Sequence, residues 1–241
     1  MSRPAERYSV PDVFTNARLV TCPGLRQDAV HEGLGGLHAA YDDPSSFLSV
    51  RLRKVRQLLS EAIVAAPAGP VRLVSLCAGQ GRDVTGVLPG HPRRDDVHAV
   101  LVESDPRNAE AARRAAAQVG LRQVEVREAD AAAVAGFADA LPADVLLLCG
   151  IFGNVSDEDI KFTVEAASAM CRPGGTVIWT RHRRPPDLTP QIRTWFAASG
   201  FDELAFDALD TEDRLMSVGA NRLRRTATAG LPDRALFTFR S

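Results

Sequence analysis

The sequence has no apolar run long enough to cross a membrane and no surplus of basic charge. Its 241 residues carry 29 basic and 30 acidic side chains, which leaves a formal net charge of −1. Proteins that bind nucleic acid usually have a basic excess, so this balance argues against such a partner. The first residues also lack the apolar centre of a signal peptide. Without a leader or a membrane span, we expect a cytoplasmic protein.

Cysteines are few and far apart, at positions 22, 77, 149 and 171. None of them forms the close pairs typical of zinc sites or iron–sulfur clusters, so we expect no metal. Buried, reduced thiols in a cytoplasmic protein fit this spacing better. A chain of this length can bury one substantial core, so one α/β domain with an added segment is expected.

Residues 67–241 contain short β-type runs that alternate with helical runs, whereas residues 1–66 read as a helical extension. Such alternation is typical of parallel strands joined by right-handed crossovers, and predicts a doubly wound, Rossmann-like α/β sheet. We expect seven strands, mostly parallel, with two of the last three candidates finishing the sheet antiparallel. Strands are predicted at 71–77, 97–103, 123–127, 144–149, 176–180, 203–209, 216–223 and 236–239, and helices at about 46–65, 106–119, 156–171 and 189–199.

A glycine loop, Gly79-Gln80-Gly81, follows the first predicted strand and precedes a helical stretch. Glycines allow a tight turn and let a ligand touch the backbone, although a simple turn would use them too. Glu103 ends the second predicted strand, where a carboxylate can accept both hydroxyl groups of a ribose. The combination of loop and strand-end acid indicates a site for a nucleoside.

The residues after the loop argue against a dinucleotide. Val84 stands where the dinucleotide fingerprint requires a small residue. Asp83 would repel a pyrophosphate, because two charges about 4 Å apart cost roughly 4 kcal/mol at an effective dielectric of 20. The same carboxylate would attract an ammonium group, or simply favour the start of a helix. No Gly-Lys-Ser/Thr follows, which excludes a P-loop. S-adenosylmethionine, a cationic nucleoside without phosphate, fits these requirements.

The sequence resembles the class I S-adenosylmethionine-dependent methyltransferases. Val71–Asp83 is similar to their motif I, and Glu103-Ser-Asp-Pro106 is similar to their acidic second-strand end. Neither the Asn-Pro-Pro-Tyr type of tetrapeptide nor the His-Asp-Glu set of metal-dependent members is present, so the methylated atom stays open. Four further segments match in the family's order, at residues 128–130, 144–154, 172–175 and 195–201.

The resemblance implies S-adenosyl-L-methionine as the cofactor and assigns its contacts. The methionine end would lie against the glycine loop and the end of the fourth strand, with Asp83 as the ammonium partner. Glu103 would bind the ribose, and Asp130 would accept from the adenine amino group, unless it only starts a helix. The implied cofactor-binding residues are Cys77, Ala78, Gly79, Gly81, Asp83, Glu103, Ser104, Ala129, Asp130, Cys149 and Gly150.

Three residues are candidates for catalysis: His182, Asn154 and Tyr41. His182 follows the fifth strand, and an imidazole titrates near neutrality, so it could act as a general base. Asn154 could orient a substrate atom, or serve as a turn residue or helix cap. Tyr41 and His38 lie in the N-terminal segment, which could be a lid over the substrate, a cap on the sheet edge or a homodimer contact.

The sequence leaves open the roles of two groups of residues, one after the fourth strand and one around His182. Phe152, beside glycines after the fourth strand, could stack on a ligand or pack in the core, and Cys149 is better explained by packing than by nucleophilic catalysis. Arg181, Arg183 and Arg184 flank His182; they would lower its pKa and could bind an acidic substrate group.

The sequence therefore predicts a methyltransferase that acts on a small molecule, which would be acidic if the arginines bind it. A nicotinamide-dependent oxidoreductase shares the Gly-x-Gly pattern and the strand-end acid, although Asp83 and Val84 oppose it. A non-catalytic S-adenosylmethionine-binding or scaffold protein also stays open, because methyl transfer requires no single obligatory residue.

Overall fold

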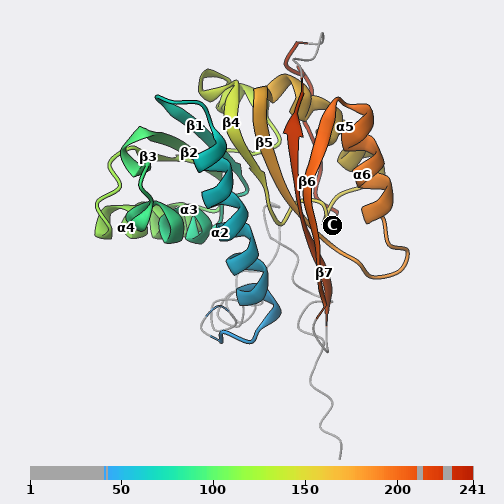
Figure 1. The fold of residues 1–241 in the computed structure, drawn as a ribbon, viewed down its shortest axis with the longest axis horizontal. Helices are drawn as coiled ribbons and strands as arrows, with labels where there is room; N and C mark the ends of the chain where they lie inside the picture. Colours follow the sequence, from blue (N-terminus) through green and yellow to red (C-terminus); the bar gives the residue numbers. More distant parts are fainter. Residues whose placement is uncertain (1–40, 42, 211–213, 225–229, 241) are drawn as a thin grey trace, which may run out of the picture.

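The computed structural model describes residues 41, 43–210, 214–224 and 230–240. They contain a seven-stranded sheet in the order β3-β2-β1-β4-β5-β7-β6 (Figure 1). The first five strands along the chain are parallel, and β7 runs antiparallel to both β5 and β6. This arrangement confirms the predicted doubly wound, mostly parallel sheet. The strands are β1 Val71–Leu76, β2 Val97–Glu103, β3 Val124–Glu128, β4 Ala143–Leu148, β5 Cys171–His182, β6 Phe201–Asp210 and β7 Leu215–Leu223.

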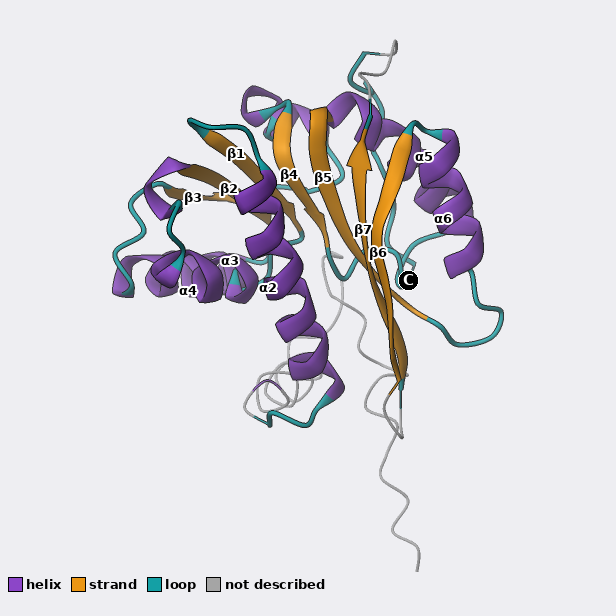
Figure 2. Cartoon of the chain, viewed as in Figure 1, coloured by secondary structure: helices purple, strands orange, loops and turns teal. Residues whose placement is uncertain are grey.

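Helices cover both faces of the sheet (Figure 2). The helices α2 Phe47–Ala65, α3 Arg82–Val87 and α4 Pro106–Gln118 pack on one face. On the other face lie α5 Asp157–Met170 and α6 Thr189–Ala198. Short 3₁₀ turns complete the connections, at Leu88–Gly90, Arg94–Asp96, Val134–Gly136 and Ala138–Ala140.

Side chains at the helix starts explain where three helices begin. The Ser46 hydroxyl accepts a hydrogen bond from the Ser49 amide at 3.2 Å, and Ser156 accepts one from the Asp159 amide at 3.0 Å. Asp105 accepts from the Arg107 amide at 2.8 Å, directly before Pro106. Each bond satisfies a backbone donor that the first helical turn leaves without a partner. The helix starts predicted near 46, 106 and 156 therefore agree with the structure.

Strand β5 and the C-terminal segment differ most from the sequence-based expectation. β5 extends from Cys171 to His182, well beyond the predicted 176–180. Pairing with β7 carries it forward to His182, and pairing of Cys171 with Ala143 of β4 carries it back to Cys171. The predicted strand at 236–239 does not form; among the described residues, this segment makes one antiparallel bridge, Val155 with Phe239. Strands β6 and β7 extend past the ends of β1 to β4 in Figure 1, beside the site described below.

The core continues on both sides of the sheet. Every residue of β4 is buried, as its near-continuous apolar sequence predicts for a strand covered on both faces. From α2, the residues Val55, Leu58, Leu59 and Ile63 join the same core as α3 and α4. The division of the chain at residue 66 remains a prediction. Within the described residues, no helix combines the length and apolarity needed to span a membrane.

Trp179 in β5 is the largest fully buried side chain. Its indole N–H donates to Asn221 Oδ1 at 2.8 Å, so the polar atom is satisfied inside the core. Gly219 lies against the ring, where an added Cβ would come within 2.3 Å. Phe152 is also fully buried, with its ring centroid 6.1 Å from that of Trp179. Of the two roles open for Phe152, the structure shows the packing role.

Candidate active site

The carboxyl ends of β1, β2 and β4 bring the predicted cofactor residues to one edge of the sheet, where open α/β sheets bind their ligands. Glu103, 7% exposed at the end of β2, accepts a hydrogen bond from the Gly79 amide at 2.7 Å through Oε2. Its Oε1 accepts from the Asp105 amide at 2.8 Å. Burial raises the pKa of Glu103, and these amides act in the opposite direction. The strand-end acid and the glycine loop are therefore in direct contact.

The two loop glycines have different structural roles. Both have positive φ, +56° at Gly79 and +64° at Gly81. A Cβ on Gly81 would lie 2.8 Å from Leu101 Cδ1, so this glycine lets α3 approach β2. A Cβ on Gly79 would meet no atom of the described residues within 4 Å, and the same holds for Gly150 after β4. Backbone at the ends of β1 and β4 thus borders open space that a ligand can enter.

Cys77 and Cys149, at the ends of β1 and β4, are not reactive thiols. Cys77 has a φ of +53°, which is uncommon for a residue with a side chain. This backbone conformation ends β1 at Leu76, one residue before the predicted end. Burial, then Glu103 and Asp130, raise the pKa of Cys77. Burial and then Asp83 raise the pKa of Cys149 to about 12. Both thiols stay protonated at neutral pH, which agrees with the packing role expected for Cys149.

Asp83 lies in the interior. Its side chain is 8% exposed, and its Oδ1 accepts from the Val84 amide at 2.8 Å. Burial raises the pKa of this carboxyl, and the guanidinium groups of Arg56 and Arg51 partly offset that effect. The proximity of Cys149 places Asp83 near the end of β4. Contact with the cofactor's ammonium group remains a prediction.

The predicted adenine side lies beside the end of β2. The Ala129 amide donates to the Glu103 carbonyl at 3.1 Å, and the Ala78 amide donates to the Val102 carbonyl at 3.0 Å. Asp130 is exposed, and its Oδ1 accepts from the Ala132 amide at 2.8 Å. Ser104, half-buried, follows Glu103 directly. Asp130 therefore stabilises a turn in this structure, and its contact with adenine remains a prediction.

His182 ends β5, opposite Met216 of β7. Its Nδ1 is buried and has no hydrogen-bond partner among the described residues. Burial lowers the pKa of His182 to about 4, with further lowering from the nearby Arg181 and Arg184. An added Cβ on Gly153 would lie 3.5 Å from the imidazole Cδ2, so the ring borders the loop after β4. At neutral pH this imidazole is uncharged, and its low pKa makes it a weaker proton acceptor than the general-base prediction assumes.

Asn154 shapes the loop after β4, defined here as residues 150–155. Its Nδ2 donates to the Gly150 carbonyl at 2.8 Å, and its own carbonyl accepts from the Arg240 amide at 2.8 Å. The helix cap of α5 is Ser156, so Asn154 is the turn residue rather than the cap. A further tie, from the Gly150 amide to Thr180 Oγ1 at 2.9 Å, joins the ends of β4 and β5.

Tyr41 lies near the glycine loop, whereas His38 falls outside the described residues. The Tyr41 hydroxyl accepts from Arg51 Nη2 at 3.3 Å, and the Arg82 guanidinium lies 4.9 Å from the centre of its ring. No hydrogen bond among the described residues joins Tyr41 to His182 or Asn154. The three catalytic candidates are therefore not brought together as one hydrogen-bonded group.

The three arginines of the β5 end are in different environments. Arg181 is 7% exposed, and its Nη1 donates to the Phe152 carbonyl. Arg183 forms ion pairs with Asp210 at 2.7 Å and Asp187 at 3.5 Å. Arg184 is exposed. Sequence reasoning missed Thr180, Arg51 and Arg240: Thr180 sits in an apolar strand run, and the two arginines belong to no motif, so only the fold brings them to this edge.

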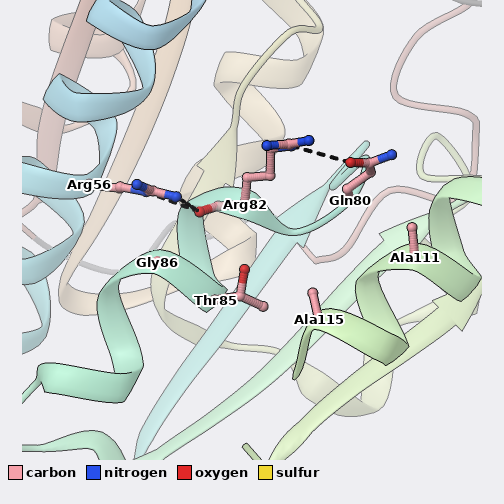
Figure 3. A pocket seen from close by; sticks show the side chains of 7 residues that line it. All are labelled: Arg56, Gln80, Arg82, Thr85, Gly86, Ala111 and Ala115. Carbon is pink, nitrogen blue, oxygen red and sulfur yellow. Dashed lines mark hydrogen bonds between the residues drawn. The ribbon is translucent and has the colours of Figure 1, made fainter. Parts of the chain in front are cut away.

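A cavity of about 330 Å³ lies on the outer side of the glycine loop, between α2, α3 and α4 (Figure 3). Arg56 donates from Nε and Nη2 to the Arg82 carbonyl at 3.0 and 2.6 Å, and Arg82 Nε donates to Gln80 Oε1 at 3.2 Å. Neither Glu103 nor His182 lines it. This cavity is therefore separate from the predicted cofactor site. Its lining consists of Arg56, Gln80, Arg82, Thr85, Gly86, Ala111 and Ala115.

Comparison with known proteins gives a family and a fold. Residues 37–197 match the family model described as "Putative methyltransferase". No curated protein matches the sequence. Magnesium protoporphyrin IX methyltransferase from Synechocystis, solved with bound S-adenosylmethionine, superposes with a TM-score of 0.62 at 10% identity, over 84% of this chain and all of that one.

Two Burkholderia thailandensis structures have the same fold. The 1,6-didemethyltoxoflavin-N1-methyltransferase, solved with 1,6-didemethyltoxoflavin and S-adenosylhomocysteine, has a TM-score of 0.57 at 14% identity, over 86% of this chain and 94% of that one. An O-methyltransferase family protein has a TM-score of 0.55 at 18% identity, over 76% of this chain. The present chain spans 58% of the length of that protein.

Proposed function

The chain belongs to the methyltransferase family whose model it matches and has the class I fold, and on this premise we propose that it transfers a methyl group from S-adenosyl-L-methionine to a small-molecule acceptor. Two structures of the same fold have small-molecule acceptors in their names, a magnesium porphyrin and 1,6-didemethyltoxoflavin. The balanced charge of the chain, −1 overall, supports a small acceptor over nucleic acid.

The contact between Glu103 and the Gly79 amide is the observation that carries the proposal. A carboxylate has about four acceptor positions, so Glu103 can hold the loop amide and still accept from ribose hydroxyl groups. The open space beside Gly79 and Gly150 would take the methionine part, close to the Asp83 carboxyl. The residues present therefore fit a nucleoside with a cationic tail, and the Asp83 carboxyl opposes a diphosphate.

The residues of this chain would act mainly by orientation. Bound S-adenosylmethionine supplies a methyl group on a sulfonium, which a nucleophile attacks in line. Thr180 holds the end of β5 to Gly150 after β4, and Asn154 closes the loop after β4 on itself. Together they would align the surface on which the acceptor rests. Neutral His182 would take the proton from an acceptor O–H or N–H as the new bond forms. Buried walls of β5 and β7 limit the entry of water.

Calorimetric titration tests the cofactor assignment. We expect S-adenosylmethionine and S-adenosylhomocysteine to bind and NAD not to bind. Glu103→Gln should weaken S-adenosylhomocysteine binding at least tenfold, or about 1.4 kcal/mol, because an amide offers fewer acceptor positions. Glu165→Gln, on the exposed side of α5, is the matched control and should change affinity less than twofold. Binding of NAD without any response to the methyl donor would refute the assignment.

A second experiment tests the acceptor class. Labelled methyl groups from the donor should enter the small-molecule fraction of a cell extract, and His182→Gln should slow that transfer while the cofactor dissociation constant stays unchanged. Label that appears only in protein or nucleic acid would contradict a small-molecule acceptor. An equal rate for the variant would remove His182 from catalysis.

A further inference from the structure

The charges around the end of β5 do not balance. Arg183 forms ion pairs with two carboxylates, Asp210 at 2.7 Å and Asp187 at 3.5 Å. Arg240, from the C-terminal segment, forms an ion pair with Asp157 at 3.5 Å. No carboxylate of the described residues lies within 4.0 Å of Arg181 or Arg184, although both guanidinium groups are near enough to affect the pKa of His182. Among the described residues, two cations at this edge therefore lack a carboxylate at ion-pair distance, and Asp157 and Asp187 act on Arg181 only from farther away.

Arg181 is the unusual member of this group, because it is buried. Its Nη1 donates to the Phe152 carbonyl, while its Nε is buried without any hydrogen-bond partner. A buried charge normally has an ion pair and a complete set of hydrogen bonds, because leaving water is costly. Burial lowers the pKa of Arg181. The surrounding charges act in both directions, because Asp157 and Asp187 raise this pKa while Arg240 and Arg184 lower it. An incompletely bonded, buried guanidinium calls for an acceptor beyond the described residues, either a water molecule or a ligand.

The next residue shows the same deficit. His182 Nδ1 is buried and has no hydrogen-bond partner among the described residues. Arg181 and His182, which are consecutive at the end of β5, therefore each have a buried nitrogen without a partner. Both border the loop after β4: Arg181 through the Phe152 carbonyl and His182 beside Gly153. Arg181 lacks an acceptor, and a neutral imidazole can itself be an acceptor. One ligand with an oxyanion and a nearby O–H or N–H would satisfy both.

We propose that the end of β5 binds a carboxylate of the methyl acceptor, with Arg181 and Arg184 as its cationic partners and His182 beside the atom that is methylated. This inference rests on the proposed function and specifies its substrate class. A carboxylate fits better than a point anion, because the Nε edge of a guanidinium offers two parallel donors that match two carboxylate oxygens. Arg183 has no part in it, since Asp187 and Asp210 already neutralise that group.

Calorimetry on protein saturated with S-adenosylhomocysteine tests the site, with benzoate as the probe and benzamide as its uncharged counterpart of the same shape. Benzoate should bind saturably, and benzamide at least tenfold more weakly. Arg184→Gln should weaken benzoate at least fivefold, whereas the matched control Arg183→Gln should change it less than twofold. Arg181→Gln should abolish saturable binding. If Arg181→Gln does not fold, the benzoate affinities of Arg184→Gln and Arg183→Gln decide whether the anion site exists.

Equal affinity for benzoate and benzamide, no saturable benzoate binding, or equal effects at positions 183 and 184 would each overturn the inference. Inorganic phosphate that binds more tightly than benzoate would overturn the carboxylate assignment. The S-adenosylhomocysteine titration is done first and judges the proposed function separately. If that titration fails, benzoate is titrated into the free protein, so the anion site and the cofactor site are tested independently.

Discussion

The depressed pKa of His182 makes the stability of the protein depend on pH in a way that one substitution should remove. An imidazole in an unfolded chain titrates near 6.5, whereas burial and the charges of Arg181, Arg184 and Arg240 lower the folded pKa to about 4. Asp187 opposes this lowering only in part. Between these two pH values, the unfolded chain binds a proton at position 182 and the folded protein does not.

The sign of the effect follows from this difference. Because the unfolded state takes up more protons, the free energy of unfolding falls as pH decreases from 6.5 to about 4, and the contribution is constant below that value. The full difference corresponds to about 3 kcal/mol at roughly 1.36 kcal/mol per pH unit. The ring is only half-buried, so solvent screening reduces the expected loss to about 1–2 kcal/mol.

Urea unfolding at pH 7 and pH 4.5 measures this term. His182→Gln carries no titrating group, so it should lose about 1–2 kcal/mol less stability between the two pH values than the wild type does. Every other acid and base titrates in both proteins, and the difference therefore isolates position 182. His98→Gln, which removes an exposed imidazole, should behave like the wild type. Equal losses in the wild type and His182→Gln would refute the argument that this imidazole is held neutral.

Three further perturbations have expected outcomes. Gly79→Ala should cost about 1 kcal/mol of stability, because its φ is positive, and should abolish cofactor binding. Gly81→Ala should cost a further ~1–3 kcal/mol, because its methyl group would lie 2.8 Å from a leucine of β2. Urea unfolding measures the stability of both variants, and calorimetry measures their cofactor binding. Iodoacetamide should alkylate Cys149 at pH 8 at least about a hundredfold more slowly than a free thiol, because burial raises the pKa of Cys149 to about 12. Mass spectrometry measures the rate of alkylation, and rapid labelling would contradict the burial of this thiol. Asn221→Leu should destabilise the protein by about 1–3 kcal/mol, because the indole N–H of β5 loses its acceptor; an unchanged urea midpoint would show that this bond contributes nothing.

Local sequence patterns were enough to predict the sheet and the positions of the glycine loop and Glu103 at the ends of its strands. Strand alternation and helix periodicity depend on neighbours only a few residues away, so Val97–Glu103 was predicted with its observed bounds and the helix of Pro106 to within one residue. The glycine loop and Glu103 lie at the ends of consecutive parallel strands, and parallel topology alone requires that such ends meet at one edge. Their direct contact follows from this topology.

Only the tertiary structure decided the surroundings of the β5 end. Pairing with β7 extends β5 to His182, and no residue near 182 encodes that pairing. The partners of Arg183 and Arg240 come from distant parts of the chain, so the sequence could not tell which arginine is neutralised and which is left uncompensated. Phe152 and Asn154 likewise took their packing and turn roles from the elements around them. Local patterns determine elements and their order, whereas the charge and burial of a side chain depend on what the fold places against it.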